Sequence, residues 1–183
     1  MRKQQIEPYK QFAQSYYVER DTAHNFRHIE RIISRLDFLS LEVFPPPNRA
    51  LLYFVACFHG LMTKLKEDRL FRDRLRYFLR DLQWTEAEIK TAFQSLERHL
   101  NKPQTSEEKI VHDANYIELL GAFGIAKAFT TGGAKKQTYE ETADIFEYQY
   151  LNKIVFITPM GKRIAKERRA YTKEFLKKLR SEL

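Results

Sequence analysis

The chain has 183 residues, of which 43% are hydrophobic and 31% charged, and its 32 Lys plus Arg against 24 Asp plus Glu give a net charge of +8. This size and composition fit one globular domain with a substantial core, because six Gly and six Pro are too few for a linker-rich or low-complexity protein. One cysteine excludes an internal disulfide, no apolar run approaches the ~20 residues that span a membrane, and the first residues do not resemble a secretory signal. We therefore expect a cytoplasmic protein with a basic surface.

Helical periodicity dominates the first half of the chain. Apolar residues three and four positions apart predict helices over residues 6–19 and 22–39. After three consecutive prolines, Asn48 is expected to cap a helix over 49–62. That helix is apolar on most faces, which predicts a place at the centre of the domain. Residues 64–82 are charged and aromatic, and we expect them to lie outside.

Capping signals mark the helices of the second half. Thr85 begins a capping box, and Ser106 opens a helix that is expected to bend near Gly121 and to close at a double glycine. Residues 138–157 are predicted to form one helix. The alternative for its last four residues, the β-branched and aromatic run 154–157, is a β-strand. A Thr-Pro pair starts a last helix over 158–183. The predicted fold is all-α, a bundle of seven or eight helices in a single domain.

Histidines are the first candidates for chemistry. His24 and His28 are four residues apart in a helical stretch, so both rings lie on one face and can bind one ion. The alternative is a pair of capping or surface histidines. His59 ends the most apolar helix, where an unpaired polar group would cost roughly 1–3 kcal/mol, so it needs either a structural hydrogen bond or a metal.

A second polar group lies on the helix that Ser106 opens. At 3.6 residues per turn, His112, Asn115 and Glu118 share one face, whereas Asp113 points away from Asn115. A solvated face is the alternative interpretation. Cys57 reads as a small core residue, and the sequence contains no nucleophile elbow, P-loop or dinucleotide fingerprint.

The order of these clusters carries a family resemblance. The chain reads His-x-x-x-His-Ile-x-Arg-Ile over 24–32, then a His ending an apolar helix, then Glu-Lys-Ile-Val-x-Asp-Ala over 108–114 and Gly-Ala-x-Gly-Ile-Ala-x-Ala-Phe over 121–129. Together with the Thr-Pro-x-Gly-Lys start of the last helix, these motifs resemble the HD-domain superfamily of metal-dependent phosphohydrolases, most of all its small single-domain bacterial branch. The resemblance spans about residues 21–182 and implies one HD-like domain over 1–183.

The resemblance also implies a metal site in which this chain lacks two acids. In such proteins an early His, a His-Asp doublet and a late Asp ligate one divalent metal, which polarises a phosphate ester and activates water. The resemblance places the two histidines on His28 and His59, but the two acids fall on Gly60 and Asn115. The residual ligand set is therefore His28, His59 and Asn115. Possible substitute ligands are His24, His112 and Glu118.

These substitutions predict an HD-superfamily protein with an eroded metal site, which binds a phosphorylated small molecule or nucleotide with little or no hydrolysis. The alternative is an active phosphohydrolase on a nucleotide or another phosphomonoester, with rearranged ligands. We expect no tightly bound cofactor, and a divalent Mn, Fe, Ni, Zn or Mg ion if one is present. Candidates for phosphate binding are Arg31, Lys135 and Lys136. No membrane partner is expected, and the sequence does not specify an oligomeric state.

The last helix suggests a third function, association with nucleic acid. It is rich in Lys and Arg, and such surfaces neutralise nucleic-acid phosphates. Three Glu residues interrupt the basic face, however, and an apolar stripe predicts a helix packed on one side, which makes nucleic acid the weaker partner prediction. The stripe consists of Ile164, Tyr171, Phe175, Leu179 and Leu183.

Overall fold

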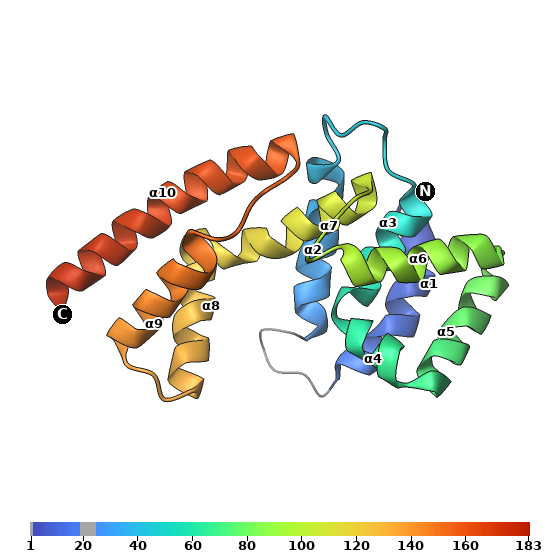
Figure 1. Cartoon of the computed structure of the whole chain (residues 1–183), viewed down its shortest axis with the longest axis horizontal. Helices are drawn as coiled ribbons and strands as arrows, with labels where there is room; N and C mark the ends of the chain where they lie inside the picture. The colour runs from blue at the N-terminus through green and yellow to red at the C-terminus, as the bar shows by residue number, and fades with distance from the viewer. Residues whose placement is uncertain (1, 19–24) are drawn as a thin grey trace. The chain divides into compact units, whose positions relative to one another are not determined.

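The computed structural model describes residues 2–18 and 25–183, and within these ranges the chain forms helices, turns and loops and no β-strand (Figure 1). The predicted all-α fold is confirmed. The α-helices are labelled α1 to α10 in chain order. Short turns divide several of the predicted helices into shorter ones. Among the described residues, no helix is both long enough and apolar enough to cross a membrane.

The chain divides into two compact units. The first unit comprises Met1–Leu36 and Phe44–His112, and the second comprises Asp37–Val43 and Asp113–Leu183. The expectation of one domain over 1–183 concerns both units together and stays a prediction.

The first unit is built around α3 (Arg49–Phe58), which packs against α1 (Arg2–Gln14) and α6 (Glu86–Arg98). Every side chain of α3 from Leu52 onward is buried, so the central position predicted for this helix is confirmed. Asn48 caps it, because its side-chain oxygen accepts hydrogen bonds from the backbone N–H groups of Ala50 and Leu51. The helix ends four residues before the predicted boundary, at a 3-10 turn over His59–Leu61.

The remaining helices of this unit complete an aromatic core. They are α2 (Phe26–Leu39), most of which belongs to this unit, α4 (Met62–Glu67), α5 (Arg69–Asp81) and the start of α7 (Ser106–Tyr116). The ring of Phe12 on α1 stacks on Phe78 of α5 with centroids 4.5 Å apart, and it lies 5.8 Å from Phe58 of α3. Residues 64–82 are thus not simply external, because α5 buries Phe71, Leu75 and Leu79 on one face.

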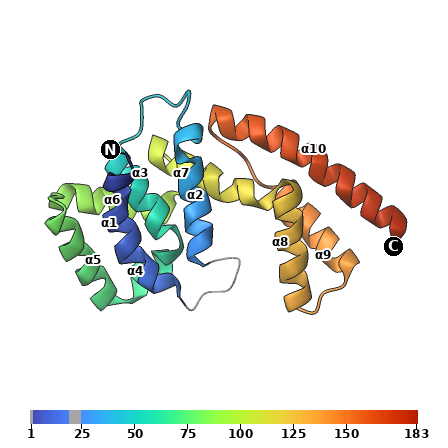
Figure 2. The same ribbon diagram turned by 180° about the vertical axis from the view of Figure 1, so that it is seen from behind.

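The second unit contains the end of α7, α8 (Gly121–Ala134), α9 (Tyr139–Phe146) and α10 (Pro159–Glu182), and α8 packs against both α9 and α10 (Figure 2). The region predicted as one bent helix is two helices. A 3-10 turn over Ile117–Leu119 and Gly121, whose φ of 74° favours glycine, separate α7 from α8. The Gly121 N–H donates a hydrogen bond to Oγ1 of Thr172, 2.9 Å away, which joins the start of α8 to α10.

The helix expected over 138–157 also ends early. After α9, a π-helical turn over Glu147–Leu151 leads into a non-helical segment that precedes α10. Thr158 caps α10 as predicted, because its side chain accepts a hydrogen bond from the N–H of Gly161, and Pro159 occupies the first turn.

The buried face of α10 differs from the predicted stripe. Its buried residues are Gly161, Ala165, Thr172 and Leu176, whereas Tyr171 is 51% exposed. Close approach explains the difference. A Cβ on Gly161 would lie only 2.8 Å from Cγ of Asp113, so this end of α10 packs through small residues rather than large apolar ones.

Candidate functional site

The imidazoles of His28 and His59 lie together in the first unit. His28 is carried by α2, and His59 begins the 3-10 turn after α3. Their ring centroids are 5.4 Å apart in an edge-to-face arrangement, and the two residues are only 3% and 8% exposed. The fold therefore brings together the two histidines that the family resemblance assigns to one site.

A third imidazole, that of His99, contacts His59 directly. His99 is fully buried at the end of α6, and its Nε2 lies 2.6 Å from Nδ1 of His59. Its own Nδ1 lies 2.7 Å from the backbone carbonyl oxygen of Leu96. Burial lowers the pKa of His99 from 6.5 to about 4, the Leu96 carbonyl and Glu108 acting against this shift and His112 adding to it. His99 is neutral at pH 7.

His99 is not among the residues predicted for the site. The sequence does contain a signal for its burial, because Ile89, Ala92, Leu96 and His99 follow one another at helical spacing and are all buried. It contains no signal for the contact with His59, since the two residues lie 40 positions apart.

Gly60, which the family resemblance assigns to the position of an acidic ligand, is held by its backbone. Its N–H donates a hydrogen bond to the hydroxyl oxygen of Tyr17 at 3.1 Å, and that hydroxyl donates to the carbonyl oxygen of Cys57 at 3.1 Å. Tyr17 is 2% exposed. This buried hydroxyl fixes the end of α3, where His59 begins the following turn. Burial raises the pKa of the Cys57 thiol, in line with its predicted role as a core residue.

The substitute ligands differ in their surroundings. His112 belongs to the first unit and is 7% exposed. Asn115, in the second unit, is half-buried on α7, while Glu118 is fully buried and has Oε2 3.9 Å from Nζ of Lys127. His24 lies outside the described residues. Among the residues that the structure describes, no group of three or more His, Cys, Asp or Glu side chains is arranged to hold a metal ion.

Asp113 has a structural position in the second unit. Its fully buried carboxylate accepts hydrogen bonds from the N–H of Ile157 at 3.1 Å and from the N–H and the hydroxyl of Thr158, both at 2.7 Å. A buried carboxylate requires such donors, and here they come from the residues that start α10. Asp113 thus fixes the start of α10.

The candidates for phosphate binding lie in different units. Arg31 is half-buried on α2 and follows His28 by three residues, so the two side chains lie on one face of that helix. Lys135 and Lys136 are exposed at the end of α8, where Lys136 has a φ of 60°. Arg31 is therefore the candidate that shares its unit with the imidazole cluster, by which we mean His28, His59 and His99.

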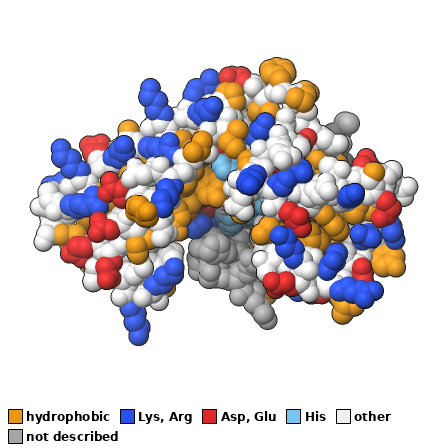
Figure 3. Space-filling model, viewed as in Figure 1, with side chains coloured by type: hydrophobic (Ala, Val, Ile, Leu, Met, Phe, Trp, Pro, Cys, Tyr) orange, Lys and Arg blue, Asp and Glu red, His pale blue; other side chains and the backbone are white. Residues whose placement is uncertain are grey.

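Several basic residues of α10 are paired with acids of the second unit. Arg163 lies 2.6 Å from Glu42, and Arg180 lies 2.8 Å from Asp144 and 2.6 Å from Glu147. On the face of the molecule shown in Figure 3, Lys and Arg side chains are mixed with Asp and Glu side chains. Nucleic-acid binding by α10 stays a prediction, and the pairing of these cations with acids weakens it.

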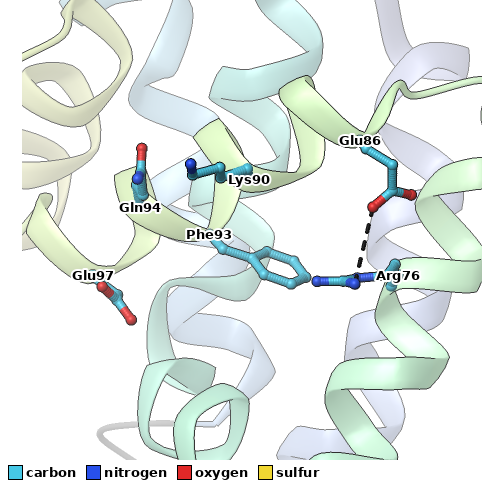
Figure 4. Close-up of a pocket in the computed structure, with 6 residues that line it drawn as sticks. All are labelled: Arg76, Glu86, Lys90, Phe93, Gln94 and Glu97. Atoms are coloured by element: carbon cyan, nitrogen blue, oxygen red, sulfur yellow. Dashed lines mark ion pairs between the residues drawn. The ribbon is translucent and has the colours of Figure 1, made fainter.

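A cavity of about 350 Å³ lies elsewhere on the first unit, between α5 and α6 (Figure 4). It is lined by Arg76, Glu86, Lys90, Phe93, Gln94 and Glu97. Arg76 and Glu86 form an ion pair 3.9 Å long, and the Phe93 ring points toward Arg76. None of the residues predicted for the site lines this cavity.

Solved structures of bacterial proteins share this fold. An HD-superfamily hydrolase from Bacillus thuringiensis matches at 24% identity with a TM-score of 0.79, over 100% of this chain and 98% of that one. YpgQ from Bacillus subtilis, in complex with ADP, matches at 19% identity with a TM-score of 0.79, over 100% and 96%. Lin1889 from Listeria innocua matches at 23% identity with a TM-score of 0.76, over 98% and 96%. No protein-family model and no curated protein matches the sequence.

At these identities the likeness defines the fold. The chain has the fold of an HD-superfamily hydrolase, as the sequence motifs implied. The residues that the family resemblance assigns to the metal-binding positions are two imidazoles, a glycine and a neutral amide.

Proposed function

We propose that this protein binds a phosphorylated small molecule, most simply a nucleotide, beside the imidazole cluster of the first unit and does not hydrolyse it. The observation that carries the proposal is the buried pair of His28 and His59, which the family resemblance assigns to ligand positions, while the acids that it implies are absent from the sequence. Binding groups are thus retained while the charge needed to hold a catalytic divalent ion is lost.

The absence of the acids bears directly on metal binding. A divalent ion in such a site is held by carboxylates that offset its charge, together with neutral imidazoles. Gly60 contributes no side chain and Asn115 contributes only a neutral amide. This donor set does not fit a tightly held divalent ion, and we derive no hydrolytic step through one.

The ligand class follows from charge and from the neighbouring structures. Arg31 shares one helical face with His28, and a guanidinium is well suited to binding phosphate oxygens in pairs. The similar YpgQ structure contains ADP, which supports a nucleotide as the first ligand to test.

Calorimetric titration of ADP into the metal-free protein tests binding. We expect saturable binding that weakens at least tenfold in Arg31→Gln, because a charge-assisted contact is worth roughly 1.5–3 kcal/mol. The matched control is Lys135→Gln with Lys136→Gln, which removes two exposed cations of the second unit and should leave the affinity within about twofold. No saturable binding, or a loss confined to the lysine variant, would contradict the proposed site.

Elemental analysis and activity measurements test whether the protein holds a metal ion and hydrolyses phosphate esters. After dialysis the protein should contain far less than one Mn, Fe, Ni or Zn per chain, and it should release no phosphate from ADP or from a general phosphomonoester when Mn²⁺ is added. One tightly bound ion per chain together with phosphate release would instead establish the phosphohydrolase with rearranged ligands.

A further inference from the structure

The contact between His59 and His99 determines which nitrogen of His59 carries a proton. The argument begins at Leu96, whose backbone carbonyl oxygen lies 2.7 Å from Nδ1 of His99. A carbonyl oxygen can only accept a hydrogen bond, so Nδ1 of His99 carries a hydrogen and donates it.

The next step follows from the neutrality of His99. Its ring is fully buried, and the two groups bonded to it, a carbonyl and an imidazole, carry no negative charge. The nearby carboxylate of Glu108 is already paired with Arg98 at 2.6 Å. A neutral imidazole with a hydrogen on Nδ1 has its lone pair on Nε2, so Nε2 of His99 accepts a hydrogen bond.

The partner of that lone pair is Nδ1 of His59, at 2.6 Å, with the two ring planes inclined by 76°. We infer that His99 is a positioning residue that holds His59 in the tautomer with its hydrogen on Nδ1 and its lone pair on Nε2. The hydrogen-bond series runs from His59 through His99 to the carbonyl of Leu96, and it reverses the preference of an imidazole in water, where the Nε2–H tautomer predominates.

This tautomer limits the chemistry of a ligand at His59. A lone pair on Nε2 of His59 can only accept a hydrogen bond, so a ligand group that contacts it is a donor such as a hydroxyl group rather than a bare phosphate oxygen. This part of the inference rests on the proposed function. Within the proposed site, the phosphate oxygens are then left to Arg31 and His28, and a hydroxyl of a nucleotide is the group suited to His59.

Long-range ¹H–¹⁵N correlation spectra of the histidine rings at pH 7 test the inference on the protein without ligand. In the wild type we expect a pyrrole-type Nδ1 and a pyridine-type Nε2 for His59. His99→Phe removes the acceptor, and the His59 ring should move toward the Nε2–H tautomer. His99→Gln is the matched variant, because its amide oxygen can accept from Nδ1 of His59 and should preserve the wild-type pattern.

The wild-type spectrum is decisive even if a variant fails to fold. A pyrrole-type Nε2 in wild-type His59, or an unchanged pattern in folded His99→Phe, would overturn the inference. The assignment of a hydroxyl to His59 is tested by following the same spectra while ADP is added. A separate titration uses inorganic pyrophosphate, which lacks a sugar hydroxyl. ADP should shift the His59 Nε2 resonance at least twice as far as pyrophosphate at saturation, and equal shifts would overturn the assignment of a hydroxyl to His59. Absence of ADP binding would defeat the proposed function and leave the tautomer result standing.

Discussion

Three imidazoles share a buried region of the first unit, and their mutual contacts explain how the core tolerates them. His59 and His99 have ring centroids 4.9 Å apart, and His28 lies beside His59. An unpaired ring nitrogen in such a place would cost roughly 1–3 kcal/mol. The hydrogen bonds from His59 to His99 and from His99 to Leu96 remove that cost while keeping His99 neutral.

The neutral state of His99 predicts a pH dependence of stability. Its pKa is about 4 in the folded protein against an ordinary 6.5. Between these values the unfolded chain binds a proton that the folded chain does not, so the contribution of His99 is fully present above pH 6.5 and is lost as the pH falls toward 4. Lowering the pH from 7 to 5 should therefore reduce the free energy of unfolding by about 2 kcal/mol through this residue.

Urea denaturation of the wild type and His99→Gln at both pH values measures the effect. Glutamine does not titrate, so the variant should lack this part of the pH dependence even if it is less stable overall. An identical loss in both proteins would show that His99 is not the responsible group.

Helix α8 contains two adjacent glycines with opposite surroundings. A Cβ on Gly132 would lie 2.9 Å from Cγ2 and 3.1 Å from Cβ of the buried Thr142 on α9, whereas a Cβ on Gly133 would meet nothing within 4 Å. The first glycine therefore permits the close approach of two helices, and the second contributes only backbone freedom.

The two positions should respond to alanine with opposite signs. Gly132→Ala forces α8 and α9 apart and should lower the free energy of unfolding by about 1–3 kcal/mol. Gly133→Ala should raise it by up to about 1 kcal/mol, because alanine favours a helix more than glycine does. Each variant is the control for the other in a thermal or urea melt. Destabilisation of equal size at both positions would contradict the packing described for α8 and α9.

At the scale of the whole molecule, the two missing acids offer a test of how far the HD arrangement is preserved. Gly60→Asp with Asn115→Asp introduces carboxylates at the two positions where the family resemblance implies acids. We expect millimolar Mn²⁺ or Ni²⁺ to stabilise this double variant, because an ion that binds only the folded state at about 100 times its Kd adds about 2.7 kcal/mol. For a chain of this size that corresponds to a rise in Tm of roughly 5–10 °C.

A matched control separates a rebuilt site from added negative charge. Gly133→Asp with Asn152→Asp makes the same chemical changes at exposed positions of the second unit. Its Tm should not respond to the metals. An equal response of the two double variants, or none in either, would indicate that His28, His59 and positions 60 and 115 do not form a common site.

The sequence by itself determined the features that depend on near neighbours in the chain. Asn48, Thr85 and Thr158 were expected to cap helices, and each accepts the backbone hydrogen bond that defines a cap. The apolar run of α3 was expected at a centre, and it is buried there. The motifs likewise implied the HD fold. Such signals are readable because a helix joins residues only a few positions apart.

Tertiary structure alone decided the features that join distant segments. The contact of His59 with His99 spans 40 positions and made His99 part of the candidate site. Gly161 lies against Asp113, so the start of α10 packs through a glycine rather than through a large apolar side chain. The break between α7 and α8 is fixed where the Gly121 N–H meets Thr172. Periodicity reports which face of a helix is buried, but it cannot report which distant side chain lies against that face, because that depends on how the helices pack.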